Sequence, residues 1–249
     1  MGLQFQKLNI PSAYQVVSRE LTRLILSGAL KTGEQLPSES LLARQFGVNR
    51  STVREGIRQL ENEGLVRREG RKRLCVTVPD QRDIAPRVIR TMVMHQVTFG
   101  ELWDVALVLE PACASLCAIN RNDDQVAALE TNLQRTGAVL RNARKCTELD
   151  TEYHSLIAKG AHNRALLLSR EPVGVLLYSA FDRLCPLLPQ ASARMFKAHE
   201  QITKAIGKGN SADAALWMRK HIIDFRRGWE MASLSLSLPV DLPRVVAEA

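Results

Sequence analysis

Most of this chain, from about residue 81 to residue 235, shows only helical periodicity. Apolar residues recur there at the spacing of an α-helix, short breakers separate the repeats, and no segment alternates as a strand does. An amphipathic helix has to bury its apolar stripe, and here only other helices can cover it. The pattern therefore predicts an all-α bundle of about seven helices, at roughly 82–96, 99–120, 123–144, 147–160, 163–183, 190–208 and 211–234.

The first 80 residues follow a different pattern. Residues 11–28 carry apolar side chains at i, i+4, i+7 and i+8, which predicts one amphipathic helix. Ser38 is placed to cap a short helix that Gly47 ends, and Asn49 then opens a third helix. After Gly64, β-branched residues cluster on both sides of a basic turn, as in a hairpin. The expected order is three helices followed by two short strands.

These patterns divide the chain into three parts. Residues 1–79 form the predicted winged helix-turn-helix, and residues 80–235 form the helical bundle, so the fold class is mainly α. The segment 236–249 alternates serine with leucine and then repeats proline. We expect it to be a flexible tail, with an edge strand as the alternative.

Charge and composition indicate the kind of partner. The chain has 34 Lys and Arg against 26 Asp and Glu, and a formal net charge of +8. Of that excess, +5 falls in the first 80 residues, which favours a polyanion bound there. No stretch of 18 or more uncharged apolar residues is present and the start lacks a signal-peptide pattern, so we expect a soluble, cytoplasmic protein without a membrane partner. The five cysteines form no CxxC pair and are expected to be reduced thiols.

The turn that opens the third helix is rich in groups that bind DNA. In a helix-turn-helix this turn enters the major groove, where arginine pairs with guanine and small polar side chains reach phosphates or bases. A row of Arg50, Arg54 and Arg58 on a lone helix would more often be a solvated face. The capped helix pair, the glycine turn, the basic hairpin and the local charge excess together favour DNA.

The stretches from Gly28 to Glu39, from Leu42 to Glu55 and from Leu60 to Val66 resemble the winged helix-turn-helix of the GntR family. The resemblance covers about 11–78. It implies an operator in double-stranded DNA and a wing that reaches the minor groove. The residues it assigns to DNA are Asn49, Arg50, Ser51, Thr52 and Arg54 on the helix, and Gly70, Arg71 and Lys72 at the wing.

Two positions depart from the pattern of that family. Ser40 stands where many members have arginine, and Lys72 stands where a glycine is usual. The first change removes a base contact and the second adds charge to the wing. The operator sequence of relatives therefore does not transfer to this chain.

Histidine is scarce, with five in all, yet three of them fall at helical positions with consistent surroundings. Asp150 and His154 share one helix face at i, i+4, and His199 and His221 lie on two later helices. Three imidazoles and a carboxylate would suit a divalent Zn, Ni or Mn ion. By spacing alone, three unrelated hydrogen-bonded histidines remain the alternative.

The run Asp150-x-x-Tyr-His154, with Asn163, His199 and the segment from Ala214 to His221, is similar to the FCD ligand-binding domain of the FadR branch. The resemblance implies that these four residues bind the metal and that the same cavity holds a small carboxylate effector. Relatives often carry an arginine three residues before the glutamate of the first helix, where this chain has Ala106 or Leu107. The effector would then bind the metal directly, or Arg183 or Arg194 would substitute.

The predicted function is a transcription regulator, a repressor whose operator affinity a small organic acid controls. A homodimer on a palindromic operator is expected, because helix-turn-helix proteins share two-fold symmetry with their operators. The alternatives are an architectural DNA-binding protein without an effector and a metal-dependent hydrolase with a DNA-binding arm. No HExxH, GxSxG or phosphate-cradling glycine loop is present, so no catalytic residues and no enzyme activity are expected.

Overall fold

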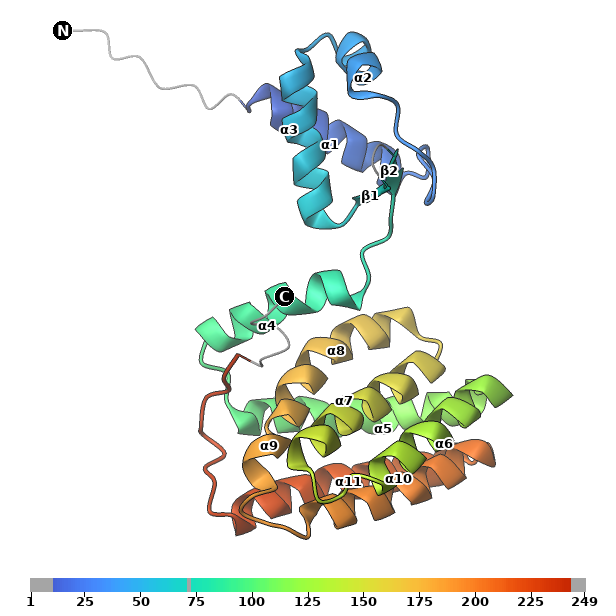
Figure 1. The fold of residues 1–249 in the computed structure, drawn as a ribbon, viewed down its shortest axis with the longest axis vertical. Helices are drawn as coiled ribbons and strands as arrows, with labels where there is room; N and C mark the ends of the chain where they lie inside the picture. Colours follow the sequence, from blue (N-terminus) through green and yellow to red (C-terminus); the bar gives the residue numbers. More distant parts are fainter. Residues whose placement is uncertain (1–10, 71–72, 243–249) are drawn as a thin grey trace, which may run out of the picture. The chain divides into compact units, whose positions relative to one another are not determined.

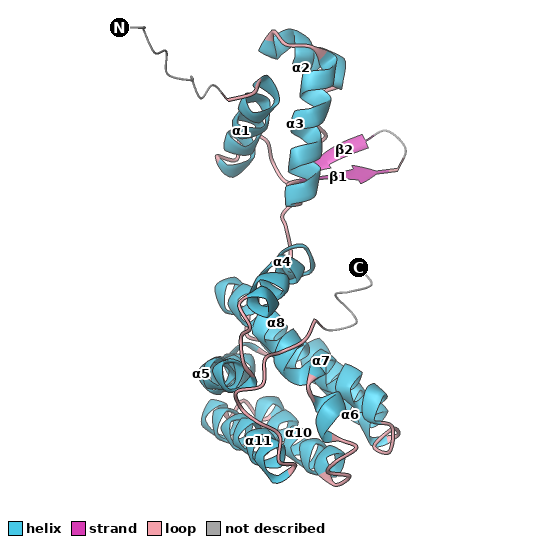
Figure 2. Ribbon diagram, turned by 90° about the vertical axis from the view of Figure 1, so that its left-hand side faces the viewer, coloured by secondary structure: helices cyan, strands magenta, loops and turns pink. Residues whose placement is uncertain are grey.

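The computed structural model describes residues 11–70 and 73–242. It is mainly helical and divides into two compact units between Asp83 and Ile84 (Figure 1). The first unit has three helices and a two-stranded hairpin, and the second is entirely helical apart from its loops (Figure 2). The predicted fold class, a winged helix-turn-helix followed by a helical bundle, is confirmed.

The N-terminal unit has the predicted order of elements. Its helices are α1 (Ala13–Leu26), α2 (Glu39–Phe46) and α3 (Arg50–Glu63), and its strands are β1 (Val66–Glu69) and β2 (Arg73–Val76). All five elements contribute to one apolar core, so α2 and α3 are fixed against each other by burial. The fully buried side chains of this core include Val17, Leu21, Leu36, Leu42, Val53, Ile57, Leu60, Val66 and Val76.

Short-range signals set the ends of α2. The Ser38 hydroxyl accepts a hydrogen bond from the Leu41 amide and caps its start. Gly47 ends it with φ of 65°, in the left-handed region that glycine adopts without strain. This sharp turn directs the chain straight into α3.

The hairpin is antiparallel, with Val66 opposite Val76 and Glu69 opposite Arg73. An isolated bridge joins Gln35 to Cys75, so the segment before α2 lies along the outer side of β2. Gly70 follows β1 with φ of 67° and begins the wing turn. The other two expected wing residues, Arg71 and Lys72, lie outside the described residues.

The helices of the C-terminal unit follow the predicted pattern with two shifts. The helix expected at 163–183 is divided at Ala180, while the helix expected at 123–144 ends at Gly137. Pro111 and Pro172 lie inside continuous helices, so neither proline breaks its helix. The helices are α4 (Gln81–Met94), α5 (Phe99–Asn120), α6 (Asp123–Gly137), α7 (Ala143–Gly160), α8 (Arg164–Ser179), α9 (Phe181–Leu184), α10 (Ala191–Gly207) and α11 (Ser211–Met231).

Helix α5 organises this unit, because it packs against α7, α8, α10 and α11. Among the described helices it alone has the length and hydropathy of a membrane span. Its inward face supplies Trp103, Cys113 and Ala114 to the apolar core of the bundle. One acidic side chain on that face, Glu110, is also buried.

The segment after α11 is attached to the start of α5 over residues 236–240. The Gly100 amide donates to the Leu236 carbonyl at 2.8 Å, and the Val240 amide donates to the Val97 carbonyl at 2.9 Å. Val240 is buried and Leu236 packs against the core. This part of the expected flexible tail is therefore anchored, by backbone hydrogen bonds to the start of α5 and by the burial of Val240. Residues 243–249 lie outside the described residues.

Gly56 marks the closest approach of α1 and α3. A Cβ atom there would lie 3.0 Å from both the Tyr14 carbonyl oxygen and Val17 Cγ1. We predict that Gly56→Val lowers the free energy of unfolding of the N-terminal unit by about 1–3 kcal/mol, because the helices must separate. Chemical denaturation followed by circular dichroism measures the loss. Glu55→Val, at an exposed position of the same helix, is the control, and equal effects of the two substitutions would contradict the prediction.

Candidate nucleic-acid interface and metal centre

The first turn of α3 presents the residues expected to contact DNA. Asn49, Arg50, Ser51 and Arg54 are exposed, and Thr52 is half-buried. Val53, between them, is fully buried against the core and fixes the rotation of the helix. The turn therefore points its polar side chains outward as a set.

Asn49 occupies the N-cap position of α3 with an extended backbone, as predicted. Its side chain, however, makes no capping hydrogen bond. The difference matters because a capping amide would be engaged with the helix. Here the Asn49 amide keeps its donors and its acceptor for an outside partner.

Glu39, at the start of α2, holds both arginines of this turn. Arg50 Nε and Arg54 Nη2 each donate to Glu39 Oε2 at 3.0 Å. The hydrogen bond from Arg54 lowers the pKa of Glu39, and the same bond raises the pKa of Arg54. Sequence reasoning missed Glu39, because an acidic residue in a first helical turn is ordinary and its partners lie 11 and 15 residues later.

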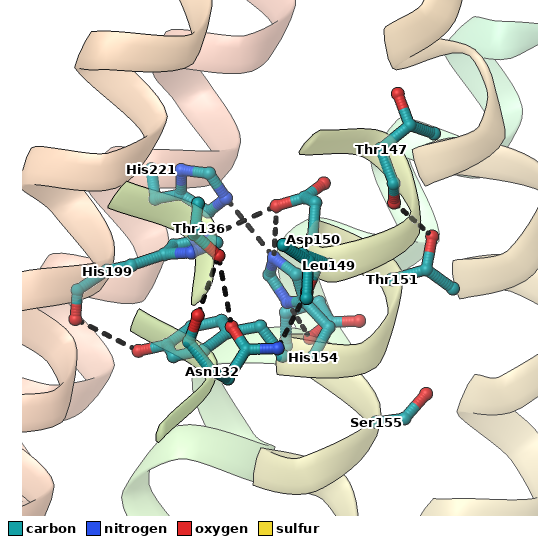
Figure 3. A network of polar contacts seen from close by, with 12 residues as sticks. Asn132, Thr136, Thr147, Leu149, Asp150, Thr151, His154, Ser155, His199 and His221 are labelled. Carbon is teal, nitrogen blue, oxygen red and sulfur yellow. Dashed lines mark hydrogen bonds and ion pairs between the residues drawn. The ribbon is translucent and has the colours of Figure 1, made fainter. Parts of the chain in front are cut away.

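The C-terminal unit brings together the four residues expected to bind a metal. Asp150 and His154 lie one turn apart on α7, His199 comes from α10 and His221 from α11 (Figure 3). One ligand atom of each lies within 4.8 Å of those of the other three, and all four side chains are buried. His154 Nε2 is 3.2 Å from His221 Nε2, and His199 Nε2 is 3.2 Å from Asp150 Oδ1.

Aromatic side chains hold two of the imidazole rings in place. The Tyr153 ring stacks on His199 with centroids 3.8 Å apart, and the Tyr178 ring stacks on His154 at 3.9 Å. Tyr153 is itself fixed, because its hydroxyl donates to the His199 carbonyl at 3.0 Å. The rings therefore cannot rotate freely within the cluster.

The donor set fits a divalent metal ion. Within the described part of the chain, Asp150 Oδ1 and both ring nitrogens of His199 are buried without a hydrogen-bond partner. Two nitrogens bound to one ion at about 2.1 Å lie about 3.0–3.4 Å apart, as His154 and His221 do. Buried oxygen and nitrogen atoms without hydrogen bonds lower the stability of a fold unless a cation accepts their lone pairs.

Burial sets the charges of the cluster. It lowers the pKa of His199 and His221 well below the ordinary range, so these imidazoles are neutral and can donate a lone pair. Burial also raises the pKa of Asp150, and the nearby His154 and His221 only partly oppose that shift. A buried carboxylate beside neutral rings is the arrangement that a cation stabilises.

Two buried charged residues next to the cluster were not among the predicted site residues. Glu110 of α5 bonds His154 Nδ1 at 2.9 Å through Oε2 and accepts from Arg170 Nε of α8 at 2.6 Å through Oε1. Burial alone would raise the pKa of Glu110, but Arg170 and His154 hold it at about 2. Glu110 is the only charged residue between positions 105 and 120 of that apolar helix, which signals such a site, yet only the fold identifies its partner.

A small cavity of about 20 Å³ borders the cluster. Asp150 and His221 line it together with Arg194, which pairs with Asp224. Arg183, the other expected effector residue, pairs with Asp241 instead and is not among the residues that line this cavity. Asp224 also lines the cavity, and the rest of its wall is mainly apolar.

A winged helix-turn-helix with an exposed polar turn, followed by a helical unit with a buried polar centre, defines a DNA-binding regulator with a second, helical domain. Comparison with known families agrees. Residues 13–76 match the family described as "Bacterial regulatory proteins, gntR family", and residues 101–224 match the family described as "FCD domain". The chain belongs to the GntR family of transcription regulators with an FCD domain, and it is not an enzyme.

Individual relatives support this assignment. An uncharacterized HTH-type transcriptional regulator, YdhC of Bacillus subtilis, is 26% identical over 87% of this chain and 89% of its own length. The Glc operon transcriptional activator of Escherichia coli K12 is 27% identical over 77% of this chain and 79% of its own. A solved structure of a GntR protein from Streptococcus agalactiae is 27% identical, with a TM-score of 0.62 over 86% of this chain and 99% of its own.

Proposed function

We propose that this regulator is a cytoplasmic repressor whose affinity for its operator is controlled by a small organic acid bound beside a metal ion. The observation that carries the proposal is the convergence of Asp150, His154, His199 and His221 at one buried point. It lies in a chain whose other unit presents an arginine-rich turn. Repression is chosen by analogy with a relative named "HTH-type transcriptional repressor NanR" from Klebsiella aerogenes, which is 26% identical over 192 residues.

On the DNA side, the proposed contacts are the polar residues of the α3 turn in the major groove, with the wing at Gly70, Arg71 and Lys72 in the minor groove. Glu39 fixes the direction of Arg50 and Arg54 before DNA binds, which lowers the entropy cost of pairing with bases. The turn is short and reads few base pairs by itself. A homodimer on a palindromic operator doubles the contacts, which is the reason for proposing that assembly.

In the sensory unit, Asp150 and the three histidines are proposed to hold a divalent Zn, Ni or Mn ion. The ion would supply a Lewis-acid position that a carboxylate effector can occupy. Arg194 lies on the cavity wall and offers a second charge for such an anion. Its present partner, Asp224, would have to yield that guanidinium, so binding of the acid and rearrangement of α10 against α11 are linked.

The first prediction concerns DNA recognition. Arg50→Ala and Arg54→Ala should each weaken binding to a duplex selected by the wild-type protein from a random pool by about 5- to 150-fold, or about 1–3 kcal/mol. Fluorescence anisotropy at physiological salt measures this. Lys72→Ala should weaken selected and random duplexes alike. Arg144→Ala, an exposed arginine of α7, is the control. Wild-type affinity in both α3 variants would refute the assignment of the recognition helix.

The second prediction concerns the metal. His199→Ala or His221→Ala should give protein depleted of metal and with a lower melting temperature, because a four-ligand site loses affinity steeply with each ligand. His95→Ala and His162→Ala are matched controls, since both residues are exposed. Elemental analysis of protein purified without chelator measures the difference. Equal metal content in all four variants would leave the cluster as buried, hydrogen-bonded histidines.

The third prediction links the sensory unit to DNA. An effector changes operator affinity only by binding one arrangement of the chain more tightly than the other. A panel of small organic acids, screened by thermal shift, should contain a compound that releases the selected duplex from wild type. The same compound should act much less on Asp150→Ala, which keeps its recognition helix. Equal release from both proteins would place effector sensing elsewhere.

A further inference from the structure

The metal cluster has a second layer of contacts that reaches across two more helices. His154 is the only cluster residue in the described chain whose second ring nitrogen bonds a buried carboxylate, Glu110. His154 Nε2 faces the other ligands, while Nδ1 faces α5. His199, by contrast, has no hydrogen-bond partner for either ring nitrogen within the described residues. The orientation of the His154 ring is therefore set by Glu110, a residue outside the four proposed metal ligands.

Glu110 is in turn fixed by an arginine that has little freedom to move. Arg170 Nε donates to Glu110 Oε1 at 2.6 Å, and Arg170 Nη1 donates to Glu171 Oε2 at 3.0 Å. A Cβ atom on Gly174 would lie 2.3 Å from Arg170 Nη2, so the absence of a side chain there makes room for the guanidinium. Arg170 is only 1% exposed, so the surrounding atoms hold its side chain in this orientation.

Burying two charges removes them from water, and for a buried ion pair this desolvation cost can exceed the attraction between the partners. A well-packed apolar pair of similar volume would fill the same space without that cost. Glu110, one member of the pair, contacts a ring nitrogen of the proposed ligand His154. This position suggests that the pair has a role other than stabilising the fold. In metal sites, a carboxylate on the second nitrogen of a histidine fixes its proton and its direction.

We propose that Arg170 and Glu110 are positioning residues that hold His154 as the Nδ1–H tautomer, with the lone pair of Nε2 directed at the metal position. The Glu110 carboxylate accepts the hydrogen bond from Nδ1–H through Oε2, and Arg170 Nε, which donates to Oε1, fixes the direction of that carboxylate. The inference rests on the proposed metal site and adds to it a support built from α5 and α8.

The first test uses the wild-type chain and needs no substitution. Long-range ¹H–¹⁵N NMR of the imidazole nitrogens, recorded on chelator-treated protein and again with Zn²⁺ added, reports which nitrogen carries the proton. We expect His154 to hold its proton on Nδ1 in both samples. A proton on Nε2 in the chelator-treated chain overturns the proposal, even if the chain binds no zinc. Failure to bind zinc with the expected tautomer present counts against the metal site alone.

The second test removes the pair together, so that no buried charge is left alone. Glu110→Gln/Arg170→Met should unfold close to the wild-type temperature when free of metal. Its affinity for Zn²⁺, measured by competition with a chelating dye, should fall about 10- to 100-fold. Arg135→Met/Glu152→Gln is the matched control, because it removes an exposed pair on α6 and α7 with the same side-chain changes.

Single substitutions separate positioning from folding. Glu110→Asp keeps the charge with a shorter reach, so it should recover part of the lost zinc affinity and the Nδ1–H signal relative to Glu110→Gln. Wild-type zinc affinity in the double variant overturns the proposal. A loss of thermal stability in that variant with zinc affinity unchanged also overturns it, since the pair would then serve only the fold. If the double variant fails to fold, the tautomer of the wild-type chain decides.

Discussion

The C-terminal unit is built around the burial of ionisable side chains, and the remaining structure accommodates that constraint. Arg170 offsets the charge of Glu110, whereas Asp150 is buried without a cationic side chain beside it among the described residues and faces the His199 and His221 rings, which burial keeps neutral. A buried carboxylate is tolerated only with a cation or a dense set of hydrogen bonds nearby. The stacked Tyr153 and Tyr178 rings and the apolar walls of α5 exclude water, so the electrostatic demand for a cation is high.

The same arrangement explains how a small ligand would act on the whole unit. The four ligand residues come from α7, α10 and α11, and their support comes from α5 and α8, so one buried point connects five helices. Packed helices respond to a bound group by small shifts between discrete arrangements rather than by gradual deformation. The cavity beside Asp150 and His221 is small, and an acid that enlarges it would move α10 against α11.

The N-terminal unit shows the opposite distribution of charge. Its core is built from apolar side chains, and no charged side chain is buried among the described residues of this unit, whose Glu39 pairs with Arg50 and Arg54 at the surface. Exposed ion pairs contribute little to stability, so this pair can be broken at small cost when a phosphate or a base replaces the carboxylate. The unit therefore has a rigid scaffold with exchangeable polar contacts on one turn.

The sequence by itself determined the elements and their type. Helical periodicity, Ser38, Gly47 and the β-branched runs are local signals, and they placed the helix-turn-helix, the hairpin and the helices of the bundle. The proximity of Asp150 and His154 could also be predicted, because i, i+4 spacing on one helix is a local pattern. Only the tertiary structure decided that His199 and His221 meet them, that Glu110 meets Arg170 60 positions away, and that the segment after α11 returns to α5. These contacts depend on how whole helices pack, which many residues decide together and no short pattern records.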